Sequence, residues 1–416
     1  MAPPVSVVIV SRGRPAALQR CLTAVAQLDY PEFEVVVVAC EAGRAAVAAR
    51  DDAAAIKLAA CDVANISAAR NIGVAEASGD IVAFIDDDAV PEPLWLSHLA
   101  GAFADPQVAA AGGFVLGRNG ISFQWRGRMV DGNGRTTDVE LDPAEPTVLH
   151  GQPGLAVKTE GTNMAVRRDV LAAIGGFDPA FHYYLDETDL NLRLAKAGRA
   201  TALVPLAQVH HGFAESPQRA ADRSPRDLFE IGASVAAFLE RHCGKGARKV
   251  ALAKHRAEQR MRCLRAMQRG PLGADDVARL MRRFRKGVRD GLTRVPAPLP
   301  PIPQATQPFR PYPGRPEAPR RVIAGRVWQA TRKRAEAAQA ARDGAIVSLY
   351  LFSPTARRHR VRFTEDGVWE QTGGLLGRSD RTDPPLRLTT FARRLRREIA
   401  RTAPVRQAQG PDGDQM

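Results

Sequence analysis

Short apolar runs alternate with amphipathic segments along the first half of the chain. Residues 5–10, 35–38 and 81–85 are runs rich in Val, Ile and Ala, and each one ends at a polar, charged or glycine-containing turn. Between them, residues 16–28 and 65–76 place apolar side chains at the three- and four-residue spacing of a helix. Strands that alternate with helices in this way predict βαβ units and a parallel sheet, which is an α/β fold of Rossmann-like type.

The pattern changes after residue 216, where basic helical segments replace the strand-like runs. Ten prolines between residues 296 and 319 indicate an extended linker. Beyond it we expect a helix over 322–342 and strands over 346–352 and 361–363. The sequence therefore predicts five segments: an α/β domain over 1–216, a basic helical region over 217–295, a Pro-rich linker over 296–320, a small α+β segment over 321–402 and a disordered tail over 403–416.

Charge divides the chain at the same place. The net charge is +14, but residues 1–216 carry a balance of −9 and residues 217–416 a balance of +23. A strongly basic half indicates an anionic partner, and a solvated basic surface is the alternative. The basic helices nearly lack the interleaved aromatic residues that are typical of nucleic-acid binding. We therefore expect peripheral contact with an anionic membrane and no nucleic-acid partner.

Cysteine usage and hydropathy indicate the compartment. The five cysteines are scattered and form no CxxC pair, which favours a reducing environment over a disulfide scaffold or a zinc site. The N-terminus lacks the features of a signal peptide, and no run of about 18 apolar residues occurs. We expect a cytoplasmic protein that reaches a membrane, if at all, at its inner face.

The apolar run 81–85 ends in three consecutive aspartates, Asp86, Asp87 and Asp88. Crowded carboxylates raise one another's pKa, and a bound cation relieves that repulsion. Hard oxygen ligands select Mg²⁺ or Mn²⁺, and ligands of open α/β sheets bind beyond the carboxyl ends of strands. The triplet is thus a candidate metal and phosphate site. A solvated turn that caps the next helix is the alternative.

Further polar groups follow in an informative order. Arg70 lies in a helix ahead of the aspartates, an acidic cluster spans 186–189, and His210 follows a strand. The set resembles the family 2 glycosyltransferases of the GT-A fold, including bacterial rhamnosyltransferase-like members, over roughly residues 4–215. The rest of the chain is then a largely helical, basic C-terminal extension.

The resemblance implies roles for residues on the donor side. Asp86 is expected near the nucleoside and ribose, while Asp88 and His210 are expected to hold Mn²⁺ or Mg²⁺ on the diphosphate, with His211 as the alternative to His210. Ala39 stands where many members carry an aspartate that reads the base, and Glu41 is the candidate substitute. The expected donor-binding residues are Ser11, Arg12, Arg14, Glu41, Asn65, Arg70, Asp86 and Asp87.

The resemblance also implies the chemistry. A carboxylate in 186–189 is expected to act as general base, with Glu187 at the base position, Asp186 as its alternative and Asp189 as a further catalytic candidate. Acceptor contacts are expected from Thr162, Asn163 and Trp95, with Trp125 as another stacking candidate.

These roles imply an inverting, metal-dependent transfer from a nucleotide-diphosphate sugar to a hydroxyl of a carbohydrate or lipid-linked acceptor, in polysaccharide or glycoconjugate synthesis. A sugar nucleotidyltransferase is one alternative reading of the sequence. A non-catalytic binding or scaffold protein with a degenerate domain is the other.

Overall fold

The computed structural model describes residues 2–294 and 298–407. Its parallel half is built from β1 (Val5–Ser11), which pairs with both β2 (Phe33–Ala39) and β4 (Ile81–Asp86), and from β3 (Ile56–Ala60), which pairs with β2. The intervening helices are α1 (Pro15–Val25), α2 (Glu41–Ala48) and α3 (Ile66–Glu76). The apolar runs are buried on both faces, as expected for parallel strands covered by helices.

The second half of the sheet is mixed. β12 (Met164–Arg167) runs antiparallel between β4 and β6 (Val108–Leu116), and β13 (Ala200–His211) runs parallel to β6. The sheet has ten strands in the order β10-β13-β6-β12-β4-β1-β2-β3, with β5 on β13 and β7 on β6. The remaining elements of this part are β5 (Ala89–Pro91), α4 (Trp95–Gly101), β7 (Phe123–Trp125), β10 (Thr147–His150), α5 (Arg168–Ala173) and α6 (Asp186–Lys196).

The excursion between β6 and β12 also forms a separate three-stranded sheet, ordered β11-β8-β9. Its strands are β8 (Arg128–Asp131), β9 (Thr136–Asp138) and β11 (Leu155–Lys158). β11 packs beside α6, so this excursion borders the acidic helix start.

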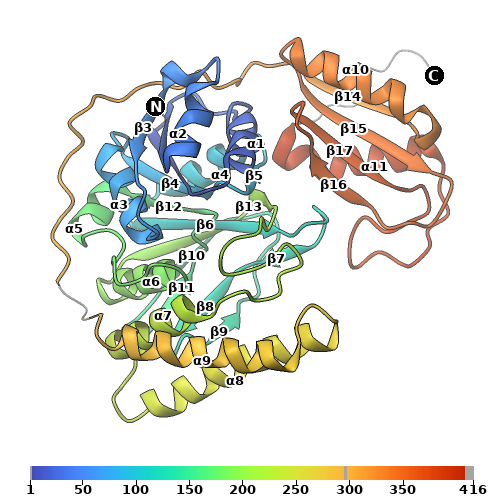
Figure 1. Cartoon of the computed structure of the whole chain (residues 1–416). Coiled ribbons are helices and arrows are strands. Elements are labelled where there is room, and N and C mark those ends of the chain that lie inside the picture. Colours follow the sequence, from blue (N-terminus) through green and yellow to red (C-terminus); the bar gives the residue numbers. More distant parts are fainter. Residues whose placement is uncertain (1, 295–297, 408–416) are drawn as a thin grey trace.

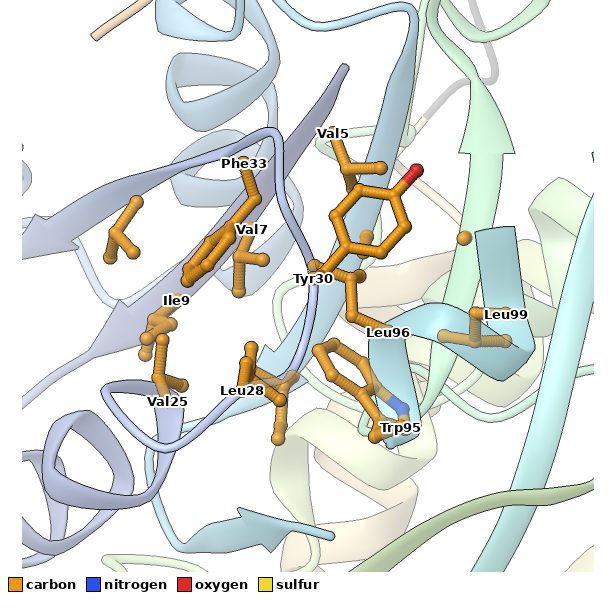
Figure 2. Packing of buried hydrophobic residues seen from close by; sticks show 14 of the residues in the cluster. Val5, Val7, Ile9, Val25, Leu28, Tyr30, Phe33, Trp95, Leu96 and Leu99 are labelled. Atoms are coloured by element: carbon orange, nitrogen blue, oxygen red, sulfur yellow. The ribbon is translucent and has the colours of Figure 1, made fainter. Parts of the chain in front are cut away.

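An apolar core covers one face of the large sheet. Figure 2 shows Val5, Val7 and Ile9 of β1 facing Leu28 and Phe33, with Trp95 of α4 closing the cluster. Alternate residues of β1 pack on opposite faces, because successive side chains of a strand point to opposite sides of the sheet. The rigid strands carry the polar side chains at their carboxyl ends.

Three helices follow the sheet and cover its lower side in Figure 1: α7 (Phe229–His242), α8 (Arg248–Gln268) and α9 (Ala274–Gly291). α7 and α9 approach closely through glycine. A Cβ on Gly287 would meet the Phe229 carbonyl at 1.9 Å, and one on Gly232 would meet the Phe284 carbonyl at 2.3 Å. This packing buries the apolar face of α9 and leaves many of the arginines of α8 and α9 on the surface.

The Pro-rich segment is extended over the described residues 298–319 and crosses the left side and top of the view in Figure 1. It is attached along its length and does not behave as a free linker. Ile302 donates its amide to Ala172, and Tyr312 enters the core against Phe33 and donates its hydroxyl to Asp52 at 2.5 Å. Residues 295–297 of the predicted linker lie outside the described residues.

The C-terminal unit is a four-stranded sheet ordered β14-β15-β17-β16 with two helices. Its elements are β14 (Arg320–Arg326), α10 (Ala330–Arg342), β15 (Ile346–Ser353), β16 (Arg360–Phe363), β17 (Val368–Gly374) and α11 (Phe391–Arg406). The predicted helix over 322–342 is wrong in its first third, because β14 pairs with β15 there.

The predicted disordered tail over 403–416 is also wrong where it begins. α11 continues to Arg406, which is 2% exposed. Residues 408–416 of that prediction lie outside the described residues. Among the described helices, none is both long and apolar enough to cross a bilayer.

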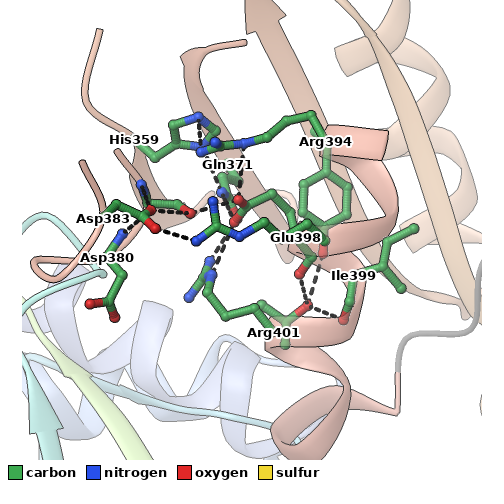
Figure 3. Close-up of polar contacts among 12 residues, drawn as sticks. His359, Gln371, Asp380, Asp383, Arg394, Glu398, Ile399 and Arg401 are labelled. Carbon is green, nitrogen blue, oxygen red and sulfur yellow. Dashed lines mark hydrogen bonds and ion pairs between the residues drawn. The ribbon is translucent and has the colours of Figure 1, made fainter. Parts of the chain in front are cut away.

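A buried polar network holds α11 on the C-terminal sheet (Figure 3). Gln371 donates to Nδ1 of His359 at 2.7 Å, and Nε2 of His359 lies 2.8 Å from the carbonyl of Gly374. Arg394 packs against the same ring, and its Nε lies 3.0 Å from Glu398. Burial, together with the charge of Arg394, lowers the pKa of His359 to about 4. The ring is therefore neutral in the native protein at pH 7.

This histidine is expected to make stability fall below pH 6.5. The unfolded chain binds a proton at His359 between pH 6.5 and 4 and the native chain does not, so the free energy of unfolding decreases as the pH falls through that window. H359Q should remove about 1–2 kcal/mol of the stability difference between pH 7 and pH 5, measured by urea unfolding. The exposed-site control H150Q should keep the full difference, and an unchanged difference in H359Q would contradict the assignment.

Candidate active site

Two strands and a turn bring the candidate metal ligands together. Asp86 ends β4, Asp88 follows in the turn to β5, and His211 ends β13, which pairs with β5 through His211 and Ala89. One ligand atom from each of Asp86, Asp88 and His211 lies within 4.8 Å of the other two. Two carboxylate oxygens and an imidazole nitrogen suit Mn²⁺ or Mg²⁺, so these residues fit the expected ion.

Asp88 is held on several sides. It accepts a hydrogen bond from the amide of Ala214 at 2.7 Å, and His211 Nε2 lies 3.3 Å away. The guanidinium groups of Arg14 and Arg219 lie at 3.3 and 3.5 Å. Burial opposes ionisation, but His211, Arg14 and the Ala214 amide together hold the pKa of Asp88 well below its usual range. Asp88 is therefore a candidate ligand that is ionised at neutral pH.

Asp87 binds side chains of the loop after β1. Ser11 donates to it at 2.7 Å and Arg14 pairs with it at 2.5 Å, while the carboxylate is fully buried. Burial raises the pKa of Asp87 to about 7 in spite of Arg14. The predicted donor residues Ser11, Arg14 and Asp87 thus form one connected group beside Asp88.

The prediction of His210 as a metal ligand is corrected by its position. Adjacent residues of β13 point to opposite faces, so His210 turns away from the aspartates while His211 turns toward them. His210 Nε2 lies 2.7 Å from Glu92, and its ring packs at a tilt against Trp369 of the C-terminal unit, with centroids 5.1 Å apart. His211, the alternative, takes the place beside Asp88.

Arg70 connects the three candidate metal ligands Asp86, Asp88 and His211, called the metal group below, to the acidic start of α6. Its guanidinium pairs with Asp86 at 3.3 Å, forms a close ion pair with Asp186 and donates to the Gly161 carbonyl at 3.1 Å. Arg70 is 4% exposed, so these contacts are shielded from water. The two acidic groups predicted from the sequence therefore belong to one site.

Glu187 is the more accessible carboxylate of the acidic helix start. Its side chain is 17% exposed, against 4% for Asp186. Immediately before α6, Tyr184 and Leu185 adopt positive φ angles of 78° and 66°, a strained turn that directs the first turn of this helix. Lys158 donates to Glu187 at 2.7 Å. Burial opposes ionisation of Glu187, but Lys158 outweighs it and lowers the pKa to about 2.

Asp186 differs from its neighbour. Burial and the charge of Glu187 raise the pKa of Asp186 to about 7, although Arg70 opposes the shift. Asp186 is enclosed by Arg70, whereas Glu187 retains a face toward solvent. The geometry therefore favours Glu187 as the group that can reach an acceptor hydroxyl.

The predicted catalytic role of Asp189 is wrong on this geometry. Its carboxylate is fully buried and pairs with Arg193 at 2.8 Å, and with Arg241 and His242 of α7 at 2.8 Å each. Asp189 therefore fastens α6 to α7. The prediction of Asn65 as a donor ligand is corrected in the same way, because its side chain caps α3 through the Ala68 amide at 3.0 Å and donates to Pro179 at 2.8 Å.

Two predicted acceptor residues are structural. Trp95 is fully buried and donates its indole N–H to Asn163 at 2.7 Å. Asn163 is also fully buried and donates to the carbonyls of Phe114 and Ala207 at 2.9 and 2.8 Å. Thr162 stays a candidate, since its Oγ1 is buried without a hydrogen-bond partner in the described part of the chain. Trp125, the other predicted stacking residue, lies beside the His211 ring at a centroid distance of 5.8 Å.

The residues that we expect to contact the nucleotide base lie after β1 and β2. Ala39 ends β2 and is buried, Cys40 precedes α2, and Glu41 is exposed in its first turn. Arg12 is exposed in the loop after β1. Arg12 and Glu41 lie beyond the carboxyl ends of β1 and β2, and their donor contacts stay predictions.

Lys158 and Arg219 were missed in the sequence. Lys158 ends β11 and is 7% exposed between Glu160 and Glu187. A lone lysine directly after the apolar run 155–157 was the available signal. Arg219 lies in a loop without regular structure, and nothing in its local sequence indicates that it reaches Asp88.

Replacing His211 is expected to weaken metal binding selectively. H211Q removes one of the three candidate protein ligands, so the affinity for Mn²⁺, measured by titration with electron paramagnetic resonance, should fall at least about tenfold. The neighbour variant H210Q should bind Mn²⁺ within about threefold of wild type, because His210 faces Glu92. Equal losses in both variants would contradict the assignment of His211.

The site therefore combines aspartates at the end of a central parallel strand, a histidine on a later strand and an acidic helix start, which is the set that the resemblance led us to expect. The family model for glycosyltransferase like family 2 matches residues 3–229. The chain belongs to this family, and its N-terminal domain has the GT-A fold.

The chain is also similar in sequence to individual curated proteins. The chain is 29% identical over 255 residues to the pre-mycofactocin glycosyltransferase of Mycobacterium tuberculosis, covering 58% of this chain and 49% of that protein. It is 27% identical over 244 residues to the O-antigen biosynthesis protein RfbC of Myxococcus xanthus, covering 54% of this chain and 18% of that protein. The chain thus spans less than half the length of these two relatives.

A shorter match reaches 41% identity over 59 residues, with the N-acetylglucosaminyl-diphospho-decaprenol L-rhamnosyltransferase of M. tuberculosis, and covers 14% of this chain and 19% of that protein. Among solved structures, the mannosyltransferase PcManGT of Pyrobaculum calidifontis, in complex with GDP-Man and Mn²⁺, has a TM-score of 0.43 and 17% identity. The structural match covers 70% of this chain and 88% of the mannosyltransferase chain.

Proposed function

We propose that this chain is an inverting, divalent-metal-dependent glycosyltransferase that moves a sugar from a nucleotide-diphosphate sugar to an acceptor hydroxyl. The observation that carries the proposal is the bridge made by Arg70. It pairs with Asp86 of the metal group and with Asp186 of the acidic helix, so that metal ligands and a candidate base share one site.

In the proposed reaction, Glu187 accepts the proton of the acceptor hydroxyl as that oxygen attacks the anomeric carbon. The bond to the nucleoside diphosphate breaks on the opposite side, which inverts the configuration, and the electron pair leaves with the diphosphate oxygen. Asp86, Asp88 and His211 would hold the divalent ion, which neutralises charge on the leaving diphosphate when bound. Arg14, fixed by Asp87, adds a positive charge beside the same group.

Lys158 controls the ionisation of the proposed base, Glu187. Its ammonium group keeps Glu187 ionised and orients one carboxylate oxygen. Asp186, the residue before Glu187, and its partner Arg70 are both buried. The setting that the relatives suggest is polysaccharide or glycoconjugate synthesis, with a carbohydrate or lipid-linked acceptor. The family match favours transfer of a sugar over the nucleotidyltransferase alternative.

A donor panel tests this function. With Mn²⁺, at least one of UDP, GDP and TDP should raise the melting temperature of the full chain by about 3 °C or more, and the corresponding sugar donor should release its nucleoside diphosphate. EDTA should abolish both effects. No stabilisation and no release across the panel would contradict the enzyme and favour the binding or scaffold alternative.

A further inference from the structure

Four exposed apolar side chains lie at one edge of the C-terminal sheet. Val327 and Trp328 follow β14, and Leu386 and Leu388 lie in the segment before α11. In this order the four residues are 41, 69, 53 and 80% exposed. Within the described part of the C-terminal unit, they are the large apolar residues most exposed to solvent. We call these four residues the apolar edge.

The strand register accounts for the position of the first two. β14, β15 and β17 run parallel, and Arg326, Phe352 and Gly373 pair with one another near the carboxyl ends of these strands. Since the carboxyl ends of parallel strands meet at the same edge of a sheet, the chain leaves all three strands at this edge. Arg326 is the last residue of β14, so Val327 and Trp328 lie at the edge itself.

Two contacts bring the segment before α11 to the same edge. The backbone amide of Arg387 donates to the carbonyl of Leu376 at 3.0 Å, and Leu376 lies two residues beyond the end of β17. The guanidinium carbon of Arg326 lies 5.9 Å from the ring centroid of Trp328 and 4.7 Å from that of Phe391, the first residue of α11. The residues of the apolar edge therefore belong to one surface.

The GT-A domain contacts the other end of this sheet (Figure 1). Ile346 and Trp369, at the starts of β15 and β17, share an apolar cluster with Ala24 and Val90. α11 runs from the apolar edge to Arg406, which pairs with the GT-A domain. The GT-A domain thus leaves the apolar edge uncovered, and α11 fixes the position of this edge relative to that domain.

The segments around the apolar edge are basic. Residues 384–397 include five arginines and no acidic residue, and the loop 354–359 after β15 includes two arginines and no acidic residue. Residues 375–383 after β17 include two arginines and two aspartates, of which Asp383 pairs with Arg397 of α11. The charge around the apolar edge therefore complements an anionic partner.

We propose that the apolar edge inserts into the interfacial region of an anionic lipid bilayer, while the surrounding arginines contact lipid phosphates. Exposed Trp and Leu side chains at turns are suited to the boundary between headgroups and acyl chains, where tryptophan is enriched. Arginine places its apolar stem along such a surface and its charge at the headgroups. The proposal gives the membrane contact expected from the basic half of the chain a defined surface, and it requires no sugar transfer.

The same residues fit other anionic partners less well. A nucleic-acid strand is bound by several aromatic side chains on which its bases stack. Trp328 is the one exposed aromatic residue in the described part of the C-terminal unit. A second copy of this chain would have to bring its own basic residues against these arginines, and like charges repel.

The first test is sedimentation of the full chain with lipid vesicles, without donor or metal. Vesicles of phosphatidylcholine with about 30% phosphatidylglycerol should bind the chain at least about tenfold more tightly than pure phosphatidylcholine, because each basic residue near the surface adds attraction to anionic lipid. Absence of binding, or equal binding to the two kinds of vesicle, would overturn the proposal.

Substitution of apolar residues tests the surface. W328S/L388S should weaken binding to the anionic vesicles at least about tenfold, since two large apolar side chains no longer leave water. The control V250S/M261S removes two apolar residues of the basic helix α8 that are 59 and 48% exposed, and should stay within about twofold of wild type. An equal loss in the control would place the contact elsewhere and overturn the assignment.

Substitution of arginines supplies an independent variant. R387Q/R393Q should weaken binding to the anionic vesicles about tenfold. The control R256Q/R260Q removes the same charge from exposed positions of α8 and should stay within about threefold. Equal losses would show that overall charge, and not this surface, attracts the lipid. The melting temperature of each variant should stay within about 2 °C of wild type, because all substituted side chains are exposed.

Sedimentation velocity without lipid separates the bilayer from a second copy of the chain. Wild type and W328S/L388S should have the same oligomeric state. A wild-type dimer that W328S/L388S dissociates would assign the apolar edge to a self-interface and overturn the proposal. Because none of these measurements uses donor turnover, a failure of the proposed sugar transfer would leave the membrane contact to be decided by the vesicles.

Discussion

E187Q is expected to lower kcat by about 10³-fold while donor affinity stays within about threefold of wild type. Glutamine keeps the size of the side chain and its hydrogen bond from Lys158 but cannot accept the proton of the acceptor hydroxyl. The donor is expected to depend on the metal group and Arg14 instead. Initial rates at varied donor and acceptor concentrations, with calorimetric donor binding, measure the two quantities. A loss of donor binding equal to the loss of rate would make Glu187 a structural or binding residue.

A matched control separates the base from its ion pair. Lys158 contacts both Glu187 and Glu160, so E160Q removes one carboxylate from the same lysine and leaves the candidate base in place. Its kcat should fall by less than about tenfold. K158Q supplies a pH test: without the ammonium, burial raises the pKa of Glu187, so the acid limb of the rate profile should move to higher pH. An unmoved limb would contradict Glu187 as the titrating base.

R406L is expected to destabilise the chain by about 3–5 kcal/mol. Arg406 and Glu92 are each 2% exposed and form a two-point ion pair, at 2.5 and 2.6 Å, between α11 and the GT-A domain. Burial opposes ionisation of Glu92, but Arg406 and His210 lower its pKa to about 2. Removing the guanidinium leaves this carboxylate buried beside His210 without its cation. Urea unfolding, followed by circular dichroism, measures the loss.

Two variants control this result. R396Q removes an exposed arginine of the same helix and should change stability by less than about 0.5 kcal/mol. E92L/R406L removes both buried charges and should recover much of the loss, because the unpaired charge is the main cost. A loss below about 1 kcal/mol in R406L would show that the ion pair does not hold the two units together.

Many strands and helices of the GT-A domain could be predicted from the sequence. The run 81–85 predicts a buried parallel strand, and the structure forms β4 there with Asp86 at its carboxyl end. Local hydrophobic pattern suffices for such elements, because a strand covered on both faces must be apolar throughout. The start of the C-terminal unit was misread for the converse reason: β14 includes Ile323 and Ala324 among arginines, and only pairing with β15 makes them a strand.

The candidate site was predicted as a set of residue types more reliably than as particular residues. His210 and His211 are equivalent in sequence, yet one packs against Glu92 and the other faces Asp88. Asp189 belongs to the same acidic cluster as Glu187, yet the turn of the helix directs it toward Arg241 of α7. Such choices depend on partners supplied by distant segments, which no local pattern contains.

The sequence by itself determined the alternation of strands and helices, the aspartates at the end of the central strand, the acidic helix start and the basic second half. These follow from the burial of apolar runs and from local charge. The tertiary structure alone decided that Arg70 unites Asp86 with Asp186, that Lys158 holds Glu187, and that Arg118, Arg219 and Arg223 converge on Phe213. The physical reason is that charge interactions act over a few ångströms in space, whatever the distance along the chain.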